Sequence, residues 1–246
     1  MNIVFQINGG IGKCVMATAV CEAIKKQYPD CNLIVLSGYA DVFLNNPHVD
    51  RSFNFGGASY FYETYIQGNR DFLVFAHDPY LQTEYLYQDE HLIKTWCDMF
   101  GIKYNGEMPK IYLTERERNF FISRFNSERP IMVIQTNGGA DPNMKYSWAR
   151  DIPYSNTVDV VNQFKSTYNI AHIKREDQIG FEGTTPVADS FRALVVLISM
   201  SRKRLFMDSF AQHVAAGLGL KSTVCWIANK PEVFGYDIHD NILSKP

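Results

Sequence analysis

The 246-residue sequence has no long hydrophobic run and almost no excess of charge of one sign. Its longest apolar run, residues 193–198, falls far below the ~20 residues that a membrane-spanning helix needs, and its first residues lack the basic segment of a signal peptide. Lys and Arg number 24 against 26 Asp and Glu, so the net charge of −2 provides no overall field that would gather a polyanion. We therefore expect a protein without integral membrane contact that does not coat nucleic acid indiscriminately.

Cysteine is scarce and has no pattern. The five cysteines include no C-x-x-C pair and leave an odd thiol, which fits a reducing compartment, so we expect a cytoplasmic protein without a disulfide framework. The sequence also lacks a D-x-D pair and any His and Cys spacing typical of a zinc site. We interpret the acidic and His-containing segment 237–240 as a solvated turn.

What the sequence does contain is enough apolar side chain, 46%, for a sizeable core, and too little charge, 20%, for a disordered chain. Short apolar strands alternate with helical patterns along its length. We expect strands at 3–7, 32–36, 51–55, 72–75, 111–113, 131–135, 170–173, 204–207 and 223–227. We expect helices at about 14–28, 83–100, 115–127, 155–168, 188–200 and 210–218.

Two strand, glycine-loop and helix beginnings, at residues 3–28 and 131–168, divide this alternation into similar halves. They predict two Rossmann-like α/β domains with parallel sheets that face one another across a central cleft. The pattern changes between Gly106 and Pro130, and we place the domains at 1–115 and 116–246. Because ligands of such sheets bind beyond the carboxyl ends of the strands, the loops that follow the strands are the candidate sites.

The first candidate is the loop from Asn8 through Gly9, Gly10 and Gly12 to Lys13, where backbone N–H groups could approach an oxyanion at a helix N-terminus. It is not a phosphate-binding loop of the Walker A type, because Ile7 stands where that motif has glycine. It also lacks the third glycine of the dinucleotide fingerprint. The alternative is a tight turn that merely needs small residues.

The second candidate is the small, polar loop of Thr136, Asn137, Gly138 and Gly139, followed by Lys145 and Trp148. Backbone donors, one cation and a flat aromatic face could together hold a diphosphate. A solvated loop whose tryptophan fills the core is the alternative.

Two further groups of polar residues follow predicted strands. Asp208 and Ser209 lie where strand 204–207 passes into a helix, and His213 follows about one turn further on. These three residues could bind a ligand. The alternative is that Asp208 is a plain N-cap and that His213 is satisfied by packing within the helix. His77 and Asp78 follow strand 72–75 and could include a general base, although polar residues often open a loop.

Taken in order, these segments resemble glycosyltransferase family 9, the heptosyltransferase-like group with the two-domain GT-B fold. Residues 12–29 and 45–50 are similar to the family's opening, and Asn137, Gly138 and Gly139 with Lys145 and Trp148 are similar to its second-domain loop. Asp208, Ser209, His213 and residues 215–219 resemble its D-[ST]-G-x-x-H-x-A-A-x-L-G signature. The resemblance covers most of the chain.

The resemblance implies a nucleotide-sugar donor held mainly by the second domain and a hydroxyl acceptor held mainly by the first. It assigns Lys145 to donor phosphate or sugar, Asp208 to sugar hydroxyls, and Ser209 and His213 to the diphosphate, with no required metal or other cofactor. In the family an aspartate follows the first-loop glycine and is thought to act as acceptor base. Lys13 stands in its place here, and Phe210 replaces a glycine.

We therefore expect an inverting, metal-independent glycosyltransferase that moves a hexosyl, heptosyl or pentosyl group, with Asp78 or His77 as its base. The expected acceptor is a sugar of lipopolysaccharide or another surface glycan, with a hydroxymethylated base of viral DNA as a minority alternative. A non-catalytic nucleotide-sugar-binding protein of the same fold remains an alternative, and a dinucleotide-dependent oxidoreductase is a third.

Overall fold

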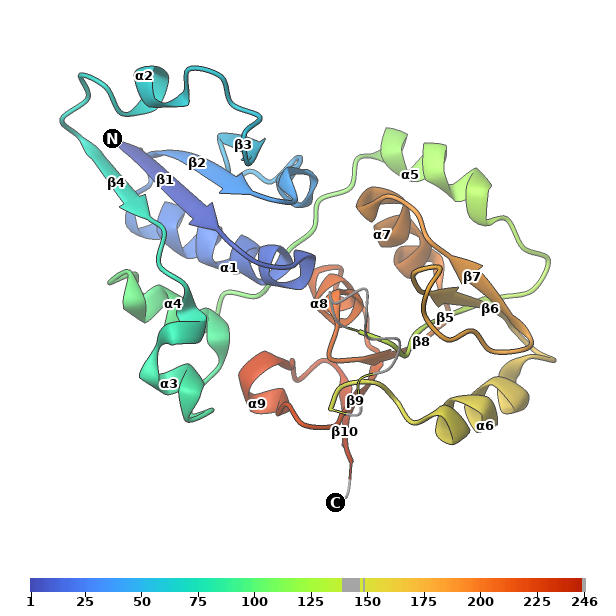
Figure 1. The fold of residues 1–246 in the computed structure, drawn as a ribbon. Helices are drawn as coiled ribbons and strands as arrows, with labels where there is room; N and C mark the ends of the chain where they lie inside the picture. The colour runs from blue at the N-terminus through green and yellow to red at the C-terminus, as the bar shows by residue number, and fades with distance from the viewer. Residues whose placement is uncertain (139–146, 148, 245–246) are drawn as a thin grey trace. The chain divides into compact units, whose positions relative to one another are not determined.

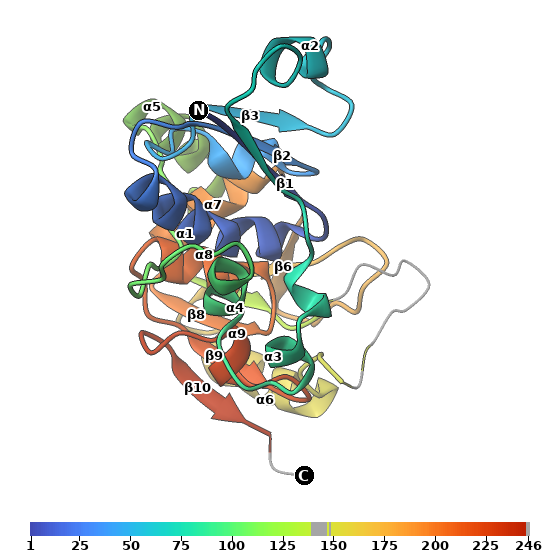
Figure 2. The same cartoon turned by 90° about the vertical axis from the view of Figure 1, so that its left-hand side faces the viewer.

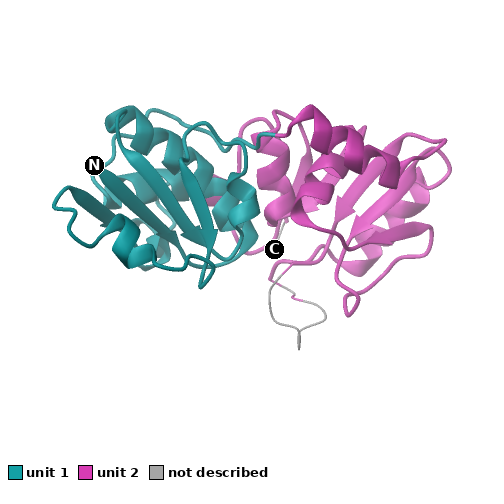
Figure 3. Ribbon diagram, turned by 90° about the horizontal axis from the view of Figure 1, so that it is seen from above, with its two compact units in different colours: residues 1–112 teal, residues 113–246 magenta. Residues whose placement is uncertain are grey.

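The computed structural model describes residues 1–138, 147 and 149–244. The chain divides into two compact units, Met1–Tyr112 and Leu113–Pro246, each built on its own parallel sheet (Figure 3). The fold class predicted from the alternation of strands and helices, α/β with parallel sheets, is confirmed for both units.

Unit 1 contains a four-stranded sheet in the order β3-β2-β1-β4 (Figure 1). Val4, in the centre of β1, is paired with Ile34 of β2 on one side and Val74 of β4 on the other. The strands are β1 (Asn2–Ile7), β2 (Asn32–Ser37), β3 (Arg51–Asn54) and β4 (Phe72–Phe75). The helices are α1 (Ile11–Gln27), α2 (Phe61–Tyr65), α3 (Thr83–Leu86) and α4 (Leu92–Met99), with 3-10 turns η1 (Ala40–Phe43) and η2 (Pro79–Leu81).

The core of unit 1 forms around β1. Phe5 is fully buried and makes edge contacts with the rings of Trp96 in α4 and of Phe100. Helix α1 packs against α4, and twelve of its residues from Lys13 to Ile24 are buried. Figure 2 shows the two helices side by side. An all-round buried helix of this kind explains why residues 14–24 are small or apolar at nearly every position.

Unit 2 contains a six-stranded sheet in the order β10-β9-β8-β5-β6-β7. Its strands are β5 (Ile131–Gln135), β6 (Asn169–Ile173), β7 (Thr184–Val187), β8 (Lys203–Met207), β9 (Thr223–Trp226) and β10 (Asp240–Leu243). Its helices are α5 (Glu115–Ile122), α6 (Tyr154–Phe164), α7 (Phe191–Met200), α8 (Phe210–Gly217) and α9 (Pro231–Phe234), with the 3-10 turn η3 (Ser123–Phe125). Read from β7, this is the Rossmann order 3-2-1-4-5-6.

Alternating residues of β5 build the two faces of this sheet. Met132 and Ile134 belong to a buried cluster that includes Val161 of α6, so α6 covers one face. Ile131 and Val133 point to the opposite face, since successive side chains of a strand alternate, and α7 packs against β5 there. Figure 1 shows α6 and α7 on the two sides of the sheet.

The sequence predicted the elements around β1, β2, β5, β6 and β8 closely, but it was wrong elsewhere. The single helix expected over 83–100 is two helices, because the chain breaks at 87–91, where Gln88 has a left-handed φ of 57°. Residues 111–113 form no strand, and the preceding Lys110 N–H donates to the Thr18 hydroxyl of α1 rather than to a sheet. Strands β7 and β10 and the short helices α2 and α9 were missed. The segment interpreted as a solvated turn does turn at 237–238, but His239 is buried and Asp240 begins β10.

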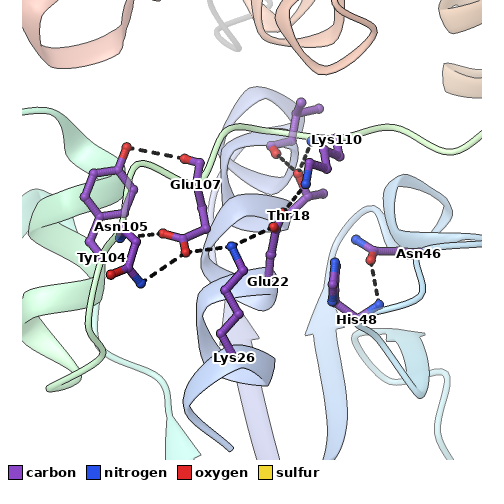
Figure 4. Close-up of polar contacts among 10 residues, drawn as sticks. Thr18, Glu22, Lys26, Asn46, His48, Tyr104, Asn105, Glu107 and Lys110 are labelled. Atoms are coloured by element: carbon purple, nitrogen blue, oxygen red, sulfur yellow. Dashed lines mark hydrogen bonds and ion pairs between the residues drawn. The ribbon is translucent and has the colours of Figure 1, made fainter. Parts of the chain in front are cut away.

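A network of charged side chains holds residues 104–110 on α1 in unit 1 (Figure 4). Glu22 accepts from Lys26 at 2.9 Å and from Lys110 at 2.6 Å, and Lys26 also contacts Glu107 at 3.0 Å. Burial raises the pKa of Glu22, but the hydrogen bonds from Lys110 and Lys26 outweigh that effect and hold it below its usual range. The last segment of unit 1 is therefore fixed to the helix that carries Lys13.

Candidate functional sites at the two switch points

Each sheet reverses its strand order at one place, and the polar residues cluster there. In unit 1 the reversal lies between β1 and β4, and in unit 2 it lies between β5 and β8. Ligands of open α/β sheets bind beyond the carboxyl ends of the strands at such a switch point. Residues 8–13 and 76–78 follow the first pair of strands, and residues 136–138 and 208–209 follow the second pair.

The first loop of unit 1 is shorter than the sequence suggested. Helix α1 begins at Ile11, so Gly12 and Lys13 lie in its first turn, and Gly10 is its N-cap without a side-chain hydrogen bond. Gly9 has a φ of +114°, which only glycine adopts readily, and a Cβ on it would lie 3.1 Å from the Lys13 Cδ. Asn8 and Gly10 are exposed. The loop therefore presents free helix N–H groups, with Lys13 folded beneath it.

Lys13 and Asp78 meet across the switch point of unit 1. The Lys13 Nζ donates to the Asp78 Oδ1 at 2.6 Å, and its side chain is only 3% exposed. The same Nζ lies over the ring of Tyr80, 4.5 Å from its centroid, and over that of Trp96 at 5.4 Å. A carboxylate and two aromatic faces all attract a positive charge, so the groups around the Lys13 Nζ suit a cation.

Asp78 keeps part of its carboxylate available. Its Oδ1 accepts from Lys13 and from the Tyr80 N–H at 3.0 Å, the second contact making it the N-cap of η2. Among the described residues none donates to Oδ2, and the side chain is 31% exposed. His77 is exposed beside it. Of the two predicted bases, Asp78 is the one whose orientation is fixed.

In unit 2 the end of β5 is closed by a buried carboxylate. Asp151, 1% exposed, accepts from the Gly138 N–H and the Ser147 N–H, each at 2.8 Å, and from the Asn137 amide at 3.4 Å. The Thr136 hydroxyl contacts the Asn137 Oδ1 and the His172 Nε2, both at 3.1 Å. The loop after β5 is thus anchored from inside.

A side chain at Gly138 would meet Met207 of the adjacent strand. A Cβ at this position would lie 2.6 Å from the Met207 Cε, and Met207 is fully buried at the end of β8. A side chain at position 138 would therefore have to displace the end of the Met207 side chain from its buried position. This contact ties the predicted loop after β5 to the predicted residues after β8.

The end of β8 carries Asp208 and Ser209, both at most 8% exposed. Burial raises the pKa of the Asp208 carboxyl above its usual range, and the Arg150 cation and the Asn229 amide, which donates to Oδ2, only partly offset that effect. Arg150 Nη2 lies 2.6 Å from the Asp208 carbonyl oxygen and 3.5 Å from Oδ2. Ser209 is the N-cap of α8, yet its Oγ has no partner among the described residues.

His213 lies deeper than the predicted diphosphate contact would suggest. It is 3% exposed, its Nδ1 lies 2.8 Å from the Tyr236 hydroxyl, and the Gln212 amide lies 3.1 Å from that same nitrogen. Gln212 also donates to the Phe234 carbonyl at 2.9 Å. The structure therefore places His213 in a buried polar cluster that joins α8 to the segment around α9.

Three of the predicted donor residues, Gly139, Lys145 and Trp148, lie outside the described residues. Sequence reasoning missed Arg150, Asp151 and Asn229, although each contacts a residue it did select. The signal for Asp151 and Arg150 was weak, an acidic and a basic residue soon after a polar loop. Asn229 had the clearer signal, since it follows strand β9 at the same edge of the sheet.

Other site chemistry is limited in the part of the chain that the structure describes. No group of three or more His, Cys, Asp or Glu residues there could hold a metal ion, and no helix there is long and apolar enough to cross a membrane. All five cysteines are free, and burial raises the pKa of Cys14 and of Cys97 to about 12. These thiols are not poised as nucleophiles.

Two Rossmann-like units, each with polar loops at its switch point, define a protein of the open α/β class, whose ligand sites lie beyond the strand ends. Comparison with solved structures identifies the fold more closely: the chain has the heptosyltransferase-like fold of glycosyltransferase family 9. The predicted resemblance is confirmed at this level.

Three solved structures illustrate the likeness. The glycosyltransferase of family 9 from Veillonella parvula DSM 2008 matches 99% of this chain and 86% of its own, with a TM-score of 0.70 and 14% identity. The ADP-heptose lipopolysaccharide heptosyltransferase II of E. coli gives 0.73 and 14%, over 99% and 90%. The E. coli heptosyltransferase WaaC with ADP gives 0.64 and 10%, over 100% and 94%. No family model and no curated protein matches the sequence.

Proposed function

We propose that this protein is a glycosyltransferase that moves a sugar from a nucleotide-sugar donor to a hydroxyl acceptor, with inversion at the anomeric carbon and without a required metal. The observation that carries the proposal is the unit 2 switch point. There Gly138, the Asp208 carboxylate and the unpartnered Ser209 hydroxyl meet beside the N-terminus of α8. Among proteins of this fold, such an arrangement suits a sugar diphosphate.

The donor is assigned to unit 2. Thr136, Asn137 and Gly138 follow β5, and the helix N-terminus at Ser209 offers unpaired N–H groups to phosphate oxygens. No described residue donates to the Asp208 Oδ1, which leaves it as an acceptor for a sugar hydroxyl. Gly139, Lys145, Trp148 and His213 complete the donor residues that we propose from the family resemblance.

The acceptor is assigned to unit 1, with Asn8, Gly9, Gly10 and Gly12 along the loop and Asp78 as the base. The acceptor oxygen attacks the anomeric carbon and its proton passes to the Asp78 carboxylate. The bond from that carbon to the diphosphate breaks, and its electron pair stays on the diphosphate oxygen. Lys13 does not remove the proton, because its Nζ already donates to the Asp78 Oδ1, but it orients Asp78.

The names of similar structures suggest which substrates to try first. ADP-heptose is the donor named for the E. coli heptosyltransferase II, and lipopolysaccharide is its named product class. We therefore propose a nucleotide-activated heptose or hexose as donor and a sugar of lipopolysaccharide or another surface glycan as acceptor. Nothing among the described residues favours modified DNA.

A panel of nucleoside diphosphates and nucleotide sugars, read by thermal shift, tests the donor assignment. A ligand at ~100 times its dissociation constant adds about 2.7 kcal/mol to the free energy of unfolding, which is easily measured. Stabilisation by one nucleotide sugar, followed by release of its nucleoside diphosphate when a glycan acceptor is added, would support the proposal. Stabilisation by no member of the panel would contradict it.

One observation favours a second candidate, a non-catalytic nucleotide-sugar-binding protein. Lys13 replaces the family aspartate and engages the Asp78 Oδ1. If this pair does not open to an acceptor, the protein would bind the donor without transfer. Donor binding with neither hydrolysis nor transfer across a broad set of acceptors would select this candidate.

A further inference from the structure

Arg150 is a cation with N–H donors that no described residue uses. A guanidinium carries five N–H donors, yet only Nη2 is engaged among the described residues: it donates to the Asp208 carbonyl oxygen at 2.6 Å and lies 3.5 Å from the Asp208 Oδ2. Its Nε is buried and has no partner in the described part of the chain. The ion pair with Asp208 is therefore incomplete, because a bidentate pair would engage both carboxylate oxygens.

The position of Arg150 is fixed from both sides of the unit 2 switch point. Its Nη2 contacts the residue after β8, and its Cζ lies 3.8 Å from the place of a Cβ on Gly138 after β5. Its own backbone is held by a hydrogen bond from its N–H to the Ser147 carbonyl at 3.0 Å, next to the buried Asp151. The guanidinium thus lies where the two strand ends meet.

Ser209 provides an independent sign of a ligand at this place. Ser209 is only 7% exposed. It occupies the N-cap position of α8, but its hydroxyl makes no capping hydrogen bond. A buried hydroxyl without a hydrogen bond destabilises the folded state, and a bound ligand can supply the missing partner. The free N–H groups of the α8 first turn lie beside it, so the missing group is an acceptor, and an anionic one is favoured.

We propose that Arg150 binds the diphosphate of the donor and stabilises the charge that this leaving group gains as the bond to the sugar breaks. This inference rests on the proposed function and adds to it a residue that the sequence did not select. Phosphate oxygens accept from a guanidinium in pairs, and they also complete the Ser209 hydroxyl and the α8 N–H groups. Preorganised donors of this kind stabilise a transition state without a metal ion.

Asp208 does not prevent this binding. Arg150 offsets its negative charge, and the Asn229 amide occupies its Oδ2. One guanidinium can bridge the carbonyl of Asp208 and a phosphate oxygen, since its donors point in several directions. The arginine thereby separates the carboxylate that we assign to sugar hydroxyls from the anion of the leaving group.

The test measures binding of ADP, GDP, UDP and CDP, and of the matching nucleosides, by calorimetry. Arg150→Gln should weaken the nucleoside diphosphate that binds the wild-type protein by roughly 10- to 100-fold and leave its nucleoside unchanged. Arg150→Lys should recover part of the loss, because it restores the charge without the paired donors. Arg124→Gln, which removes an exposed arginine paired with Asp189, is the matched control and should bind as the wild type does.

A second variant guards against misfolding of Arg150→Gln. Ser209→Ala removes a hydroxyl that makes no bond in the free protein, so it should not lower the melting temperature, yet it should weaken the same diphosphate several-fold. Equal affinity of wild type and Arg150→Gln for the diphosphate would overturn this inference alone. Failure of the wild type to bind any of the four diphosphates would overturn the proposed function with it.

Discussion

Lys13 and Asp78 are 65 residues apart in the sequence and 2.6 Å apart in the structure. Lys13 comes from the first turn of α1, after β1, and Asp78 comes from the segment after β4. Their pair spans the switch point of unit 1, where an acceptor would bind. In our proposal the Asp78 carboxylate does the work of the aspartate that the family resemblance would place at position 13, and Lys13 orients it.

Asp78→Asn should lower kcat by ~100-fold or more, because an amide cannot take the acceptor proton. The substitution keeps an oxygen for the Tyr80 N–H, so the local turn should remain. His77→Gln should reduce kcat by less than threefold, because His77 is exposed and no described contact orients it. A threefold change corresponds to about 0.6 kcal/mol in activation free energy. Steady-state kinetics with the donor identified by thermal shift would check both. A larger loss in His77→Gln than in Asp78→Asn would exchange the two roles.

The two partners should differ in their effect on stability. Asp78→Asn leaves a 3%-exposed ammonium without its carboxylate and should cost about 2–3 kcal/mol, whereas Lys13→Met leaves a 31%-exposed carboxylate that water can solvate and should cost about 1 kcal/mol. The double variant should therefore be more stable than Asp78→Asn and equally inactive. Urea denaturation of the three variants measures this, and additive losses in the double variant would contradict the coupling.

The local sequence predicted the parts of these sites that a strand and its following loop determine. Glycines 9, 10 and 138 follow short apolar strands, and these strands align because the sheet order is that of a Rossmann fold. The Asp151 contact with Gly138 was not predictable, since thirteen residues separate the two and no periodic pattern joins them. The break between α3 and α4 was missed because Gln88 is an uncommon residue in the left-handed conformation.

The ion pair of unit 1 was also only half predicted. The sequence selected Lys13 and Asp78 separately, each from the end of its own strand, but treated the lysine as a departure from the family pattern. Whether a lysine is buried as a cation depends on what the tertiary structure places around it, here Asp78, Tyr80 and Trp96. Such a cage forms only when β4 and α4 pack against β1.

Gly138→Ala should destabilise unit 2 by about 1–3 kcal/mol and weaken donor binding, because its Cβ would displace the buried Met207 side chain. Gly180→Ala is the matched control: a Cβ there meets nothing within 4 Å, so its free energy of unfolding should change by less than about 1 kcal/mol. Chemical denaturation with hydrogen exchange of β5 and β8 peptides separates unit 2 from unit 1. Equal stability of the two variants would show that the end of the Met207 side chain moves aside without cost.

His172 should make unit 2 less stable in mild acid. Burial, with a smaller effect of Lys174, lowers its pKa from 6.5 to about 4. His172 is therefore protonated below pH 6.5 in the unfolded chain but only below about pH 4 in the folded chain. The stability that comes from its neutral imidazole is present above pH 6.5 and is lost as the pH falls toward 4. Between pH 7.5 and 5 the loss is about 2 kcal/mol, at 1.36 kcal/mol for each pH unit below 6.5. His172→Gln should reduce this slope, leaving the part that comes from His239, whose pKa burial also lowers, and His77→Gln, in unit 1, should keep it. Hydrogen exchange of β5 and β6 peptides at both pH values measures the difference, and an unchanged slope in His172→Gln would assign the acid sensitivity to other groups.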